Sequence, residues 1–382
     1  MWGVNITGQG GSVSPEYPNA KESVDNHKFE EFTSIETNFV EMAKRFGASI
    51  EEIKTSIDWK DLQYNEGRLC LHEEKIPFRL KGKGTKRLLS IALQLTLIEN
   101  SGIILIDEVE QGLEPDRVRQ LVSILKKESN AQVIMTTHSS NAVVELNSNN
   151  LYRINDNTLY NFPDDNDNQS LARTNPEAFF AKRLIVVEGA TEVGLMRAVN
   201  EQLMIQGSNC SSKSIGIVDG KGSSMIKYCN ALLDAGYEVC LLCDNDRPED
   251  QKNKKKIQER GALIIQSEDN LCIEQQIFKD LSWEAVIKLY EFGKRNSKFL
   301  NSIDNLKEED TSIRTTLGLL ASGKELSKNL DDTKKGKEPK GWFKNVSHGE
   351  ELGTIIFEDR NNFLAKHMGN MIAQLHKWIN NE

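Results

Sequence analysis

Acidic side chains follow three apolar segments in the second half of the chain. LIVVE ends at Glu188, IGIVD ends at Asp219, and EVCLLCDND carries Asp244 and Asp246. Each segment is too continuously apolar to have one face in water, which predicts buried strands of a parallel sheet. Because the carboxyl ends of parallel strands lie on one edge, where open α/β folds build their sites, we expect these acids to gather there. Glu192, four residues beyond Glu188 across a glycine turn, can face the same edge.

A cluster of carboxylates suits a hard divalent cation, because carboxylate oxygens are the ligands that Mg²⁺ and Mn²⁺ prefer. Glu274, in the helix-like segment NLCIEQQIF, can add another carboxylate. An exposed helix acid is an equally good interpretation of this residue. The second half of the chain therefore predicts a Mg²⁺ or Mn²⁺ centre.

A second set of motifs lies between residues 79 and 140. The apolar segment ILIDE ends in Asp107 and Glu108, a pair that can hold Mg²⁺ and orient an attacking water. EQGLEP follows, and TTHSS closes another apolar segment with His138. Upstream, KGKGTKR opens a predicted helix whose glycines and first N–H groups can approach a phosphate. Strands and helices alternate here, which is typical of a parallel α/β sheet.

These four motifs, in this order, resemble the C-terminal half of an ABC-type ATPase head of the SMC and RecF kind. The residues that this resemblance assigns to the nucleotide site are Gly82, Gly84 and Lys86 in the signature motif, Asp107 and Glu108 in Walker B, and His138 as the switch histidine. Residues 110–115 correspond to the D-loop. The signature departs from LSGGQ, since Lys83 replaces a glycine.

No GxxxxGK[ST] motif, the loop that grips nucleotide phosphates, occurs in the sequence, and GQGGSVSP near the start lacks its lysine. ABC heads carry that loop in the N-terminal lobe, so the resemblance implies that this lobe is missing. Either the chain is a fragment or split half of a longer protein, or a partner chain supplies the loop. ATP would then be shared with the missing or partner lobe. ABC lobes act in pairs, so the resemblance also implies a homodimer or larger assembly.

EGATE and CDND, two strand–helix units apart, resemble the TOPRIM domain of topoisomerases, primases and some nucleases. With the ATPase motifs ahead and the lead-in NPEAFFAKR, the resemblance narrows to the OLD (overcoming lysogenization defect) family of ATP-dependent endonucleases. It covers roughly residues 79–360. The fold it implies is α/β, with a partial ABC ATPase lobe followed by a Rossmann-like TOPRIM domain and a helical C-terminal region.

By this resemblance the reaction is two-metal hydrolysis of DNA phosphodiester bonds, in which one ion activates a water and the second stabilises the departing oxygen. The matching metal ligands are Glu188, Glu192, Asp219, Asp244 and Asp246, with Glu274 as a further candidate. The family also uses a late lysine to offset transition-state charge. Lys344 in GWFKNV is the first choice and Lys340 the second. Relatives serve in phage defence, and the resemblance implies the same role here.

The basic run KNKKK at residues 252–256 directly follows CDND and its short RPEDQ extension. It predicts contacts of Lys254 and Lys255 with DNA phosphates, and Lys340 is a further candidate for such a contact. A charge run is more often a solvated loop, and that interpretation stays open.

Composition adds little to these expectations. The 48 basic and 57 acidic residues give a net charge of −9, which is weak evidence about DNA because a metal enzyme clusters carboxylates. No apolar run approaches the roughly 18 residues of a membrane span, and no secretory signal opens the chain. Six scattered cysteines fit a reducing compartment. We expect a cytoplasmic protein without a membrane partner.

The sequence predicts four segments. They are a helical or irregular segment at 1–78 with one amphipathic helix at 29–46, the ATPase lobe at 79–165, the TOPRIM domain at 176–280, and a helical region at 281–382 that completes the nuclease. The polar stretch PDDNDNQS at 163–170 is the expected linker.

Three other functions are less well supported. A topoisomerase needs a tyrosine nucleophile in a further domain, and a primase would be expected to carry a zinc module. The remaining alternative is a non-catalytic, ATP-sensing and DNA-binding subunit of a larger SMC/RecF-like complex. Such a subunit would have lost some acids of the cluster, whereas all the expected acids occur here.

We predict that the chain alone does not hydrolyse ATP appreciably, because it has no phosphate-gripping loop. The measurement is ATP turnover by the purified chain and by Glu108→Gln. Turnover that Glu108→Gln abolishes would contradict the prediction.

Overall fold

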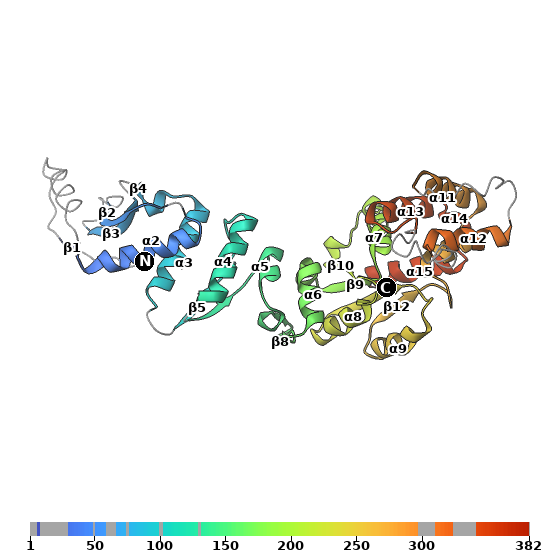
Figure 1. The fold of residues 1–382 in the computed structure, drawn as a ribbon, viewed down its shortest axis with the longest axis horizontal. Coiled ribbons are helices and arrows are strands. Elements are labelled where there is room, and N and C mark those ends of the chain that lie inside the picture. The colour runs from blue at the N-terminus through green and yellow to red at the C-terminus, as the bar shows by residue number, and fades with distance from the viewer. Residues whose placement is uncertain are drawn as a thin grey trace, which may run out of the picture. The chain divides into compact units, whose positions relative to one another are not determined.

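The computed structural model describes residues 6–7, 30–48, 50–58, 66–73, 76–98, 102–128, 131–296, 310–323 and 341–381. The chain divides into two compact units, Met1–Leu146 and Asn147–Glu382. Figure 1 shows the elements of both units in colour order along the chain.

The first unit begins with an antiparallel sheet and a helix. The strands are β1 (Ile6–Thr7), β2 (Ile53–Asp58), β3 (Glu66–Glu73) and β4 (Ile76–Pro77), in the order β1-β3-β2 with β4 also paired to β3. Helix α2 (Glu30–Arg45) buries Phe39 and Ala43, and it ends before Gly47, whose φ is +78°. This helix confirms the one expected at 29–46. The sheet was not expected, because short strands are stabilised by cross-strand partners that a linear pattern does not show.

The rest of the first unit alternates helices and strands, as the sequence predicts. The elements are the 3₁₀ turn η2 (Phe78–Leu80), α3 (Lys83–Thr96), β5 (Ile103–Ile106), α4 (Pro115–Glu128), β6 (Gln132–Met135) and α5 (Ser140–Glu145). Strands β5 and β6 are parallel, with Ile103 opposite Gln132. Their carboxyl ends therefore bring Asp107 and Thr136 to the same edge.

The second unit is built on a parallel sheet with the strand order β10-β9-β11-β12. The strands are β9 (Arg183–Val187), β10 (Ile215–Asp219), β11 (Glu238–Cys243) and β12 (Leu263–Gln266). Every side chain of β9 is buried, as a strand covered on both faces requires. The chain places β10 on one side of β9 and β11 on the other. This reversal makes the carboxyl ends of β9 and β11 the switch point of the sheet, which is where open α/β folds bind their ligands.

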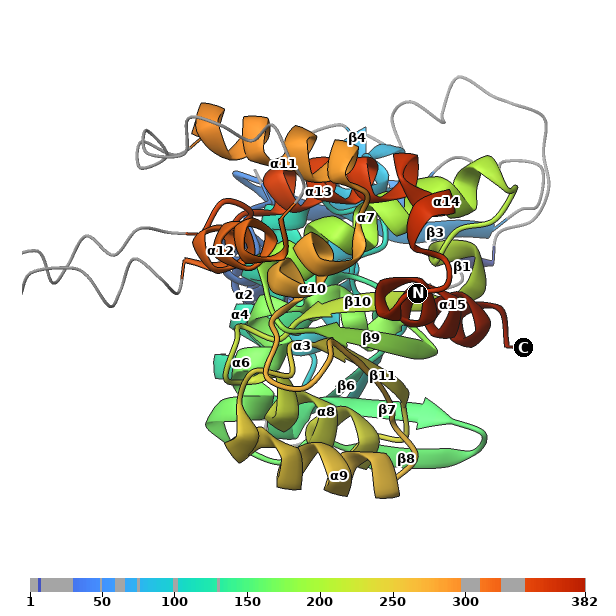
Figure 2. The same cartoon turned by 90° about the vertical axis from the view of Figure 1, so that its right-hand side faces the viewer.

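Helices cover both faces of this sheet, which confirms the Rossmann-like fold. Figure 2 shows α7 (Ala190–Ile205) on one face, and α8 (Met225–Asp234) with α9 (Gln251–Glu259) on the other. Because α7 directly follows β9, its first turn lies at the switch point.

A hairpin and a helix precede the sheet. The hairpin is β7 (Tyr152–Asn155) and β8 (Thr158–Asn161), and the helix is α6 (Asn166–Thr174). Arg153 donates to the carbonyl oxygens of Ala235 and Gly236, at 2.9 and 3.0 Å, and its guanidinium lies 3.9 Å from the Tyr237 ring centroid. The hairpin therefore belongs to the second unit, and the division at residue 146 comes before the linker expected at 163–170. That stretch instead begins α6, because Asp165 caps it by accepting from the Asn168 N–H at 2.7 Å.

Helices fill the C-terminal region, as expected. They are α10 (Ile273–Asp280), α11 (Trp283–Asn296), α12 (Thr311–Ser322), α13 (Val346–Glu358), α14 (Arg360–Phe363) and α15 (His367–Asn380). Side chains of β9, α7 and β11 share one apolar core with side chains of these helices. The sheet and the C-terminal helices consequently form a single packed body. Among the residues that the structure describes, no helix has the length and apolar character that crossing a membrane requires.

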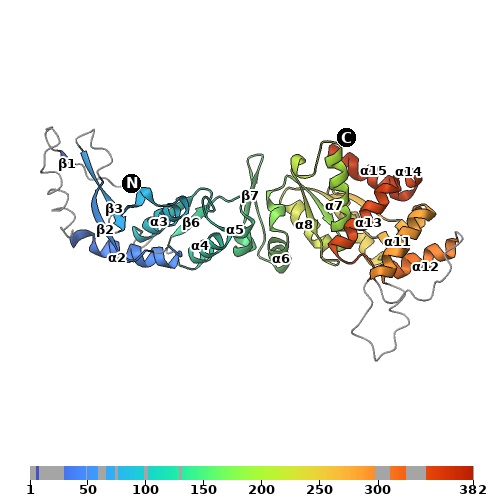
Figure 3. The same ribbon diagram turned by 90° about the horizontal axis from the view of Figure 1, so that it is seen from above.

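The closest helix packing in this body joins α7 to α13, which Figure 3 shows from above. Gly194 of α7 faces Gly349 of α13, and a methyl group at Gly194 would lie 2.6 Å from the backbone nitrogen of Glu350. Glycine is required here because the two backbones touch. This contact fixes where the segment just before α13 begins.

We predict that Gly194→Ala lowers the free energy of unfolding by about 1–3 kcal/mol, because the added methyl forces α7 and α13 apart. The measurement is urea unfolding, with Glu201→Ala on the exposed face of the same helix as the control. Equal stability of the two variants would contradict this packing role.

Candidate functional site

The switch point brings together the ends of β9 and β11. Glu188 follows β9, and its Oε2 accepts a hydrogen bond from the backbone N–H of Asp244, which follows β11, at 3.0 Å. The Glu188 side chain is 12% exposed, and Arg247 lies 3.9 Å from its other oxygen. Burial raises the pKa of Glu188, although the Asp244 N–H and Arg247 act in the opposite direction. Two of the predicted strand-end acids are therefore adjacent.

Glu192 lies in the first turn of α7 and is 4% exposed. Its Oε2 accepts from the backbone N–H of Gly189 at 2.8 Å, so the carboxylate caps the helix that carries it. Burial, and then the carboxylates of Asp244 and Glu274, raise the pKa of Glu192 well above its usual value. The EGATE motif thus brings a second glutamate, carried by α7, near Asp244 and Glu274.

Hydrogen bonds of Asn245 and of Asp244 itself fix the loop that follows β11. Asn245 is buried, and it donates to Asp269 at 2.8 Å while its backbone N–H donates to Ser267 at 3.0 Å. Asp244 Oδ1 accepts from the backbone N–H of Ile273, the first residue of α10, at 2.7 Å. Burial, followed by the Glu274 and Glu188 carboxylates, raises the pKa of Asp244 to about 8.

Glu274 completes the cluster from α10. It is fully buried, so the interpretation as an exposed helix acid is wrong. Its Oε1 accepts from Lys344 Nζ at 2.7 Å, whereas its Oε2 is buried without a hydrogen-bond partner. Burial lowers the pKa of Lys344, but the carboxylates of Glu274, Glu192 and Asp244 together outweigh burial and raise it. The structure therefore brings Lys344 to the acids from a segment far along the chain.

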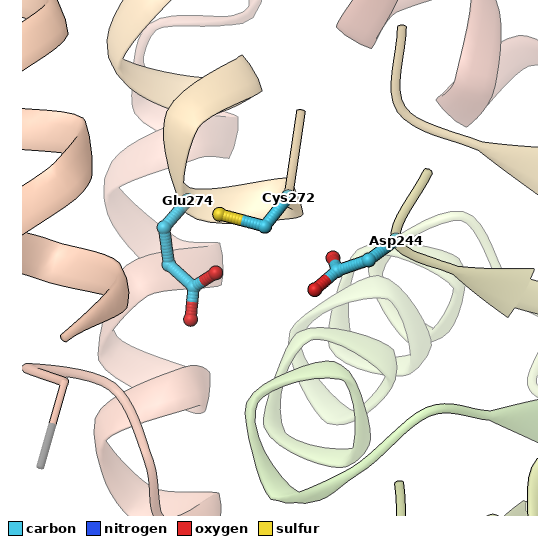
Figure 4. A group of neighbouring side chains, drawn as sticks. All are labelled: Asp244, Cys272 and Glu274. Carbon is cyan, nitrogen blue, oxygen red and sulfur yellow. The ribbon is translucent and has the colours of Figure 1, made fainter. Parts of the chain in front are cut away.

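Cys272 is a neighbour that the sequence analysis missed. Ligand atoms of Asp244, Cys272 and Glu274 all lie within 4.8 Å of one another, and Figure 4 shows the three side chains converging. Cys272 is 1% exposed and caps α10. The available signal was its position two residues before Glu274, in a segment expected to start a helix.

This arrangement fits a divalent cation. Several neighbouring carboxylates are buried and have raised pKa values, so the site is short of positive charge. One buried oxygen of Glu274 has no partner, which a bound ion would supply. Carboxylate oxygens are the donors that Mg²⁺ and Mn²⁺ take.

The other two predicted acids are placed differently. Asp246 lies close enough to raise the pKa of both Glu188 and Asp244. The carboxylate of Asp219 instead accepts from Lys221, at 2.7 Å from Nζ and 2.9 Å from the backbone N–H. The physical reason is strand order, because β10 lies on the side of β9 away from the switch point. A metal role for Asp219 would require this ion pair to open.

The basic run forms α9, not a loop, and its lysines differ in exposure. Lys254 is 3% exposed, and its Nζ donates to the carbonyl oxygen of Asp244 at 2.6 Å and to Gln266 at 3.1 Å. The prediction that Lys254 contacts DNA is therefore wrong. Its ammonium is buried and stabilises the loop that carries Asp244. Lys255 is exposed. Lys340 lies outside the described residues.

In the first unit, the predicted Walker B residues lie at an exposed edge. Asp107 Oδ1 accepts from the Thr136 hydroxyl at 2.6 Å, and the same hydroxyl accepts from the Glu108 N–H at 2.8 Å. Glu108 has a φ of +48°, a left-handed conformation uncommon outside glycine. Glu110 accepts from the Thr137 hydroxyl and from the His138 N–H, each at 2.6 Å. These bonds join the ends of β5 and β6.

The predicted signature residues lie beside the D-loop. Gly82 precedes α3 and Gly84 lies in its first turn, where a methyl group would touch the backbone of Gly112. Arg87 of the same helix donates to the carbonyl oxygen of Glu108 at 3.1 Å. Lys86 is exposed and donates to the carbonyl oxygen of Arg79 at 3.3 Å. The expected ATPase motifs are thus neighbours in space within this unit.

Two protein-family models match the chain. Residues 11–145 match the model described as "AAA domain, putative AbiEii toxin, Type IV TA system". Residues 179–246 match the model described as "Overcoming lysogenization defect protein-like, TOPRIM domain". The second match begins before β9 and ends at Asp246, so it includes the acids of the switch point but not Glu274 or Lys344.

Solved structures give weaker likenesses, and no curated protein matches. A chain described as "C-terminal region of the Burkholderia pseudomallei OLD protein" is 15% identical, with 50% of this chain and 99% of that chain covered and a TM-score of 0.28. A chain from "Structural biochemistry of ATP-driven dimerization and DNA stimulated activation of SMC ATPases" is 14% identical, with 34% and 82% covered and a TM-score of 0.25. Scores this low do not establish shared geometry.

We predict that Mg²⁺ or Mn²⁺ raises the melting temperature of the protein, because a cation relieves repulsion among buried carboxylates. An ion at a hundred times its Kd adds about 2.7 kcal/mol. Asp244→Asn, which can still accept from the Ile273 N–H, should lose this gain and be at least as stable as wild type without metal. The measurement is thermal unfolding with and without the ion.

The control is Asp234→Asn. Asp234 is the last residue of α8, and its exposed carboxylate pairs with Arg260. This variant should respond to the ion as wild type does. An equal response from Asp244→Asn would contradict a metal site at the switch point.

Proposed function

Because the chain is an OLD-family protein that joins an AAA-type ATPase domain to a TOPRIM domain, we propose that it is a Mg²⁺- or Mn²⁺-dependent endonuclease that nicks or cleaves DNA. The domain pair is that of an ATPase-coupled nuclease. The observation that supports this activity best concerns Glu274, whose buried Oε2 has no hydrogen-bond partner and whose carboxylate lies beside Asp244.

The proposed ligands of two ions are Glu188, Glu192, Asp244, Asp246 and Glu274. When bound, such ions lower the pKa of a water and stabilise the oxygen that leaves the phosphate. The chain itself orients these ligands, since backbone N–H groups hold Glu188, Glu192 and Asp244 in place. Rigid carboxylates of this kind need little rearrangement when a phosphate arrives.

Lys344 is the proposed basic residue of the reaction. Its ammonium lies 2.7 Å from Glu274 Oε1, and its side chain is 40% exposed, so it borders both the acids and the solvent from which DNA comes. Beside a phosphate it would offset the charge that develops in the transition state. Lys255, which is exposed, and Lys340 are proposed to contact the DNA backbone.

The helical region at 281–382 is proposed to complete the nuclease begun by the TOPRIM domain at 176–280. Two observations support this assignment. The helices share the apolar core of the sheet, and the segment before α13 carries Lys344 to Glu274. The TOPRIM domain by itself would lack this lysine.

The ATPase domain is proposed to regulate cleavage. Asp107, Glu108 and His138 lie exposed at one edge of the first unit, which suits a nucleotide held between two lobes. Since the sequence has no GxxxxGK[ST] motif, we propose that a missing or partner lobe supplies the phosphate loop and that the chain acts as a homodimer or larger assembly. A cytoplasmic role in phage defence is the proposed setting.

We predict nicking of supercoiled plasmid by the purified protein in Mg²⁺ or Mn²⁺, tested with and without a complementing ATPase lobe. Glu188→Ala and Asp244→Ala should abolish it, because each removes a proposed ligand, and Asp234→Asn should not. Absence of metal-dependent nicking under both conditions would favour the non-catalytic, ATP-sensing and DNA-binding alternative. Nicking that persists unchanged in both alanine variants would indicate a contaminating nuclease.

Lys344→Gln refines the same assay. The amide can still donate to Glu274 but carries no charge, so we expect nicking to fall by about 10²–10³-fold while the stabilisation by Mg²⁺ remains. A rate within a few fold of wild type would assign Lys344 a structural role only.

A further inference from the structure

A sulfur atom lies among the oxygens of the proposed metal centre. Cys272 Sγ is within 4.8 Å of carboxylate oxygens from both Asp244 and Glu274, as Figure 4 shows. Mg²⁺ does not favour a thiol ligand, because it binds oxygen ligands in near-ideal octahedral geometry. A thiolate instead favours softer ions, among them Zn²⁺.

The local structure suits a metal-bound thiolate. Cys272 is the N-cap residue of α10 and is 1% exposed, so its sulfur is held in a fixed position beside the two carboxylates. Its thiol donates to the neutral side-chain amide of Gln275, at 3.3 Å from Oε1. Loss of that proton to solvent, on binding of a metal, would leave the sulfur as a ligand.

A second observation points to the same ion site. Glu274 is fully buried, and Lys344 binds only its Oε1, which leaves Oε2 without a hydrogen-bond partner. The Glu274 carboxylate, Asp244 and the Cys272 sulfur together offer three protein ligands. Zinc sites with three protein ligands keep a fourth position for water or a substrate.

We propose that Asp244, Cys272 and Glu274 form a mixed oxygen and sulfur site that binds Zn²⁺, and that Zn²⁺ thereby competes with Mg²⁺ or Mn²⁺ at the nuclease centre. The competition between Zn²⁺ and Mg²⁺ or Mn²⁺ rests on the proposed nuclease function, whereas the binding of Zn²⁺ does not. Zinc binding is measured without DNA, so its failure and a failure of the nuclease proposal are distinguishable.

The first experiment titrates the full chain with Cd²⁺, a spectroscopic stand-in for Zn²⁺, and follows the ultraviolet band of a metal–thiolate bond. Wild type should show the band, and Cys272→Ser should lose it. The matched control is Cys210→Ser, another buried cysteine, which precedes β10 at the opposite edge of the sheet from the switch point. A band that persists in Cys272→Ser, or that Cys210→Ser removes, would overturn the proposal.

Calorimetric titration with Zn²⁺ gives the size of the effect. Loss of residues that only support a metal ligand weakens binding by about 10–100-fold, so loss of the sulfur itself in Cys272→Ser should weaken Zn²⁺ binding by at least about 10-fold. Mg²⁺ binding should be unchanged or tighter, because serine offers an oxygen. Equal Zn²⁺ affinity in wild type and Cys272→Ser would refute the assignment.

Glu274→Gln tests the site without altering the sulfur, in case Cys272→Ser does not fold. The amide can still accept from Lys344, but one charged ligand is lost. Zn²⁺ binding should weaken, and the cadmium–thiolate band should appear only at higher Cd²⁺ concentration. Unchanged titrations in this variant would equally refute the proposed site.

Discussion

Buried carboxylates that repel one another impose the main constraint on the second unit, because the surrounding elements must hold them together. Glu188, Glu192, Asp244 and Glu274 lie together at the switch point, and burial raises the pKa of the first three. Such a cluster is tolerated only where each charge is compensated. Backbone N–H groups and the Lys344 ammonium compensate part of it. Glu274 Oε2 has no hydrogen-bond partner, and a bound cation would compensate its charge.

The rest of the fold holds these charges against their repulsion. Close contact of α7 with α13 at Gly194 and Gly349 sets Lys344, just before α13, beside Glu274. On the other side, Lys254 lies beneath the loop after β11 and donates to the Asp244 carbonyl oxygen. The core shared by the sheet and the C-terminal helices makes these supports one rigid body. Precise placement of metal ligands requires this kind of packed surround.

In the first unit the informative feature is the exposure of apolar side chains on β5 and β6. Parallel strands are normally covered on both faces, yet Ile103 and Leu105 of β5 and Ile134 of β6 are 65%, 70% and 51% exposed. The predicted nucleotide-site residues Asp107, Glu108 and His138 follow the carboxyl ends of the same strands. An apolar face beside exposed Walker B acids is consistent with a further lobe that covers the strands and brings the phosphate loop.

The sequence by itself determined the alternation of strands and helices from β5 to β6, the buried strands β9, β10 and β11, and the acids at their ends, because buried strands and amphipathic helices have local periodicities. It did not determine α6, where a linker was expected. Through EGATE and CDND it also indicated the TOPRIM domain, which the family model over residues 179–246 confirms. Only the tertiary structure decided which acids meet. Strand order separates Asp219 from the switch point, and burial changes Lys254 from a surface charge into a support. Chain packing joins Lys344 to Glu274 across 70 residues and sets Cys272 among the oxygens. These contacts depend on how distant elements pack, which no local pattern of residues encodes.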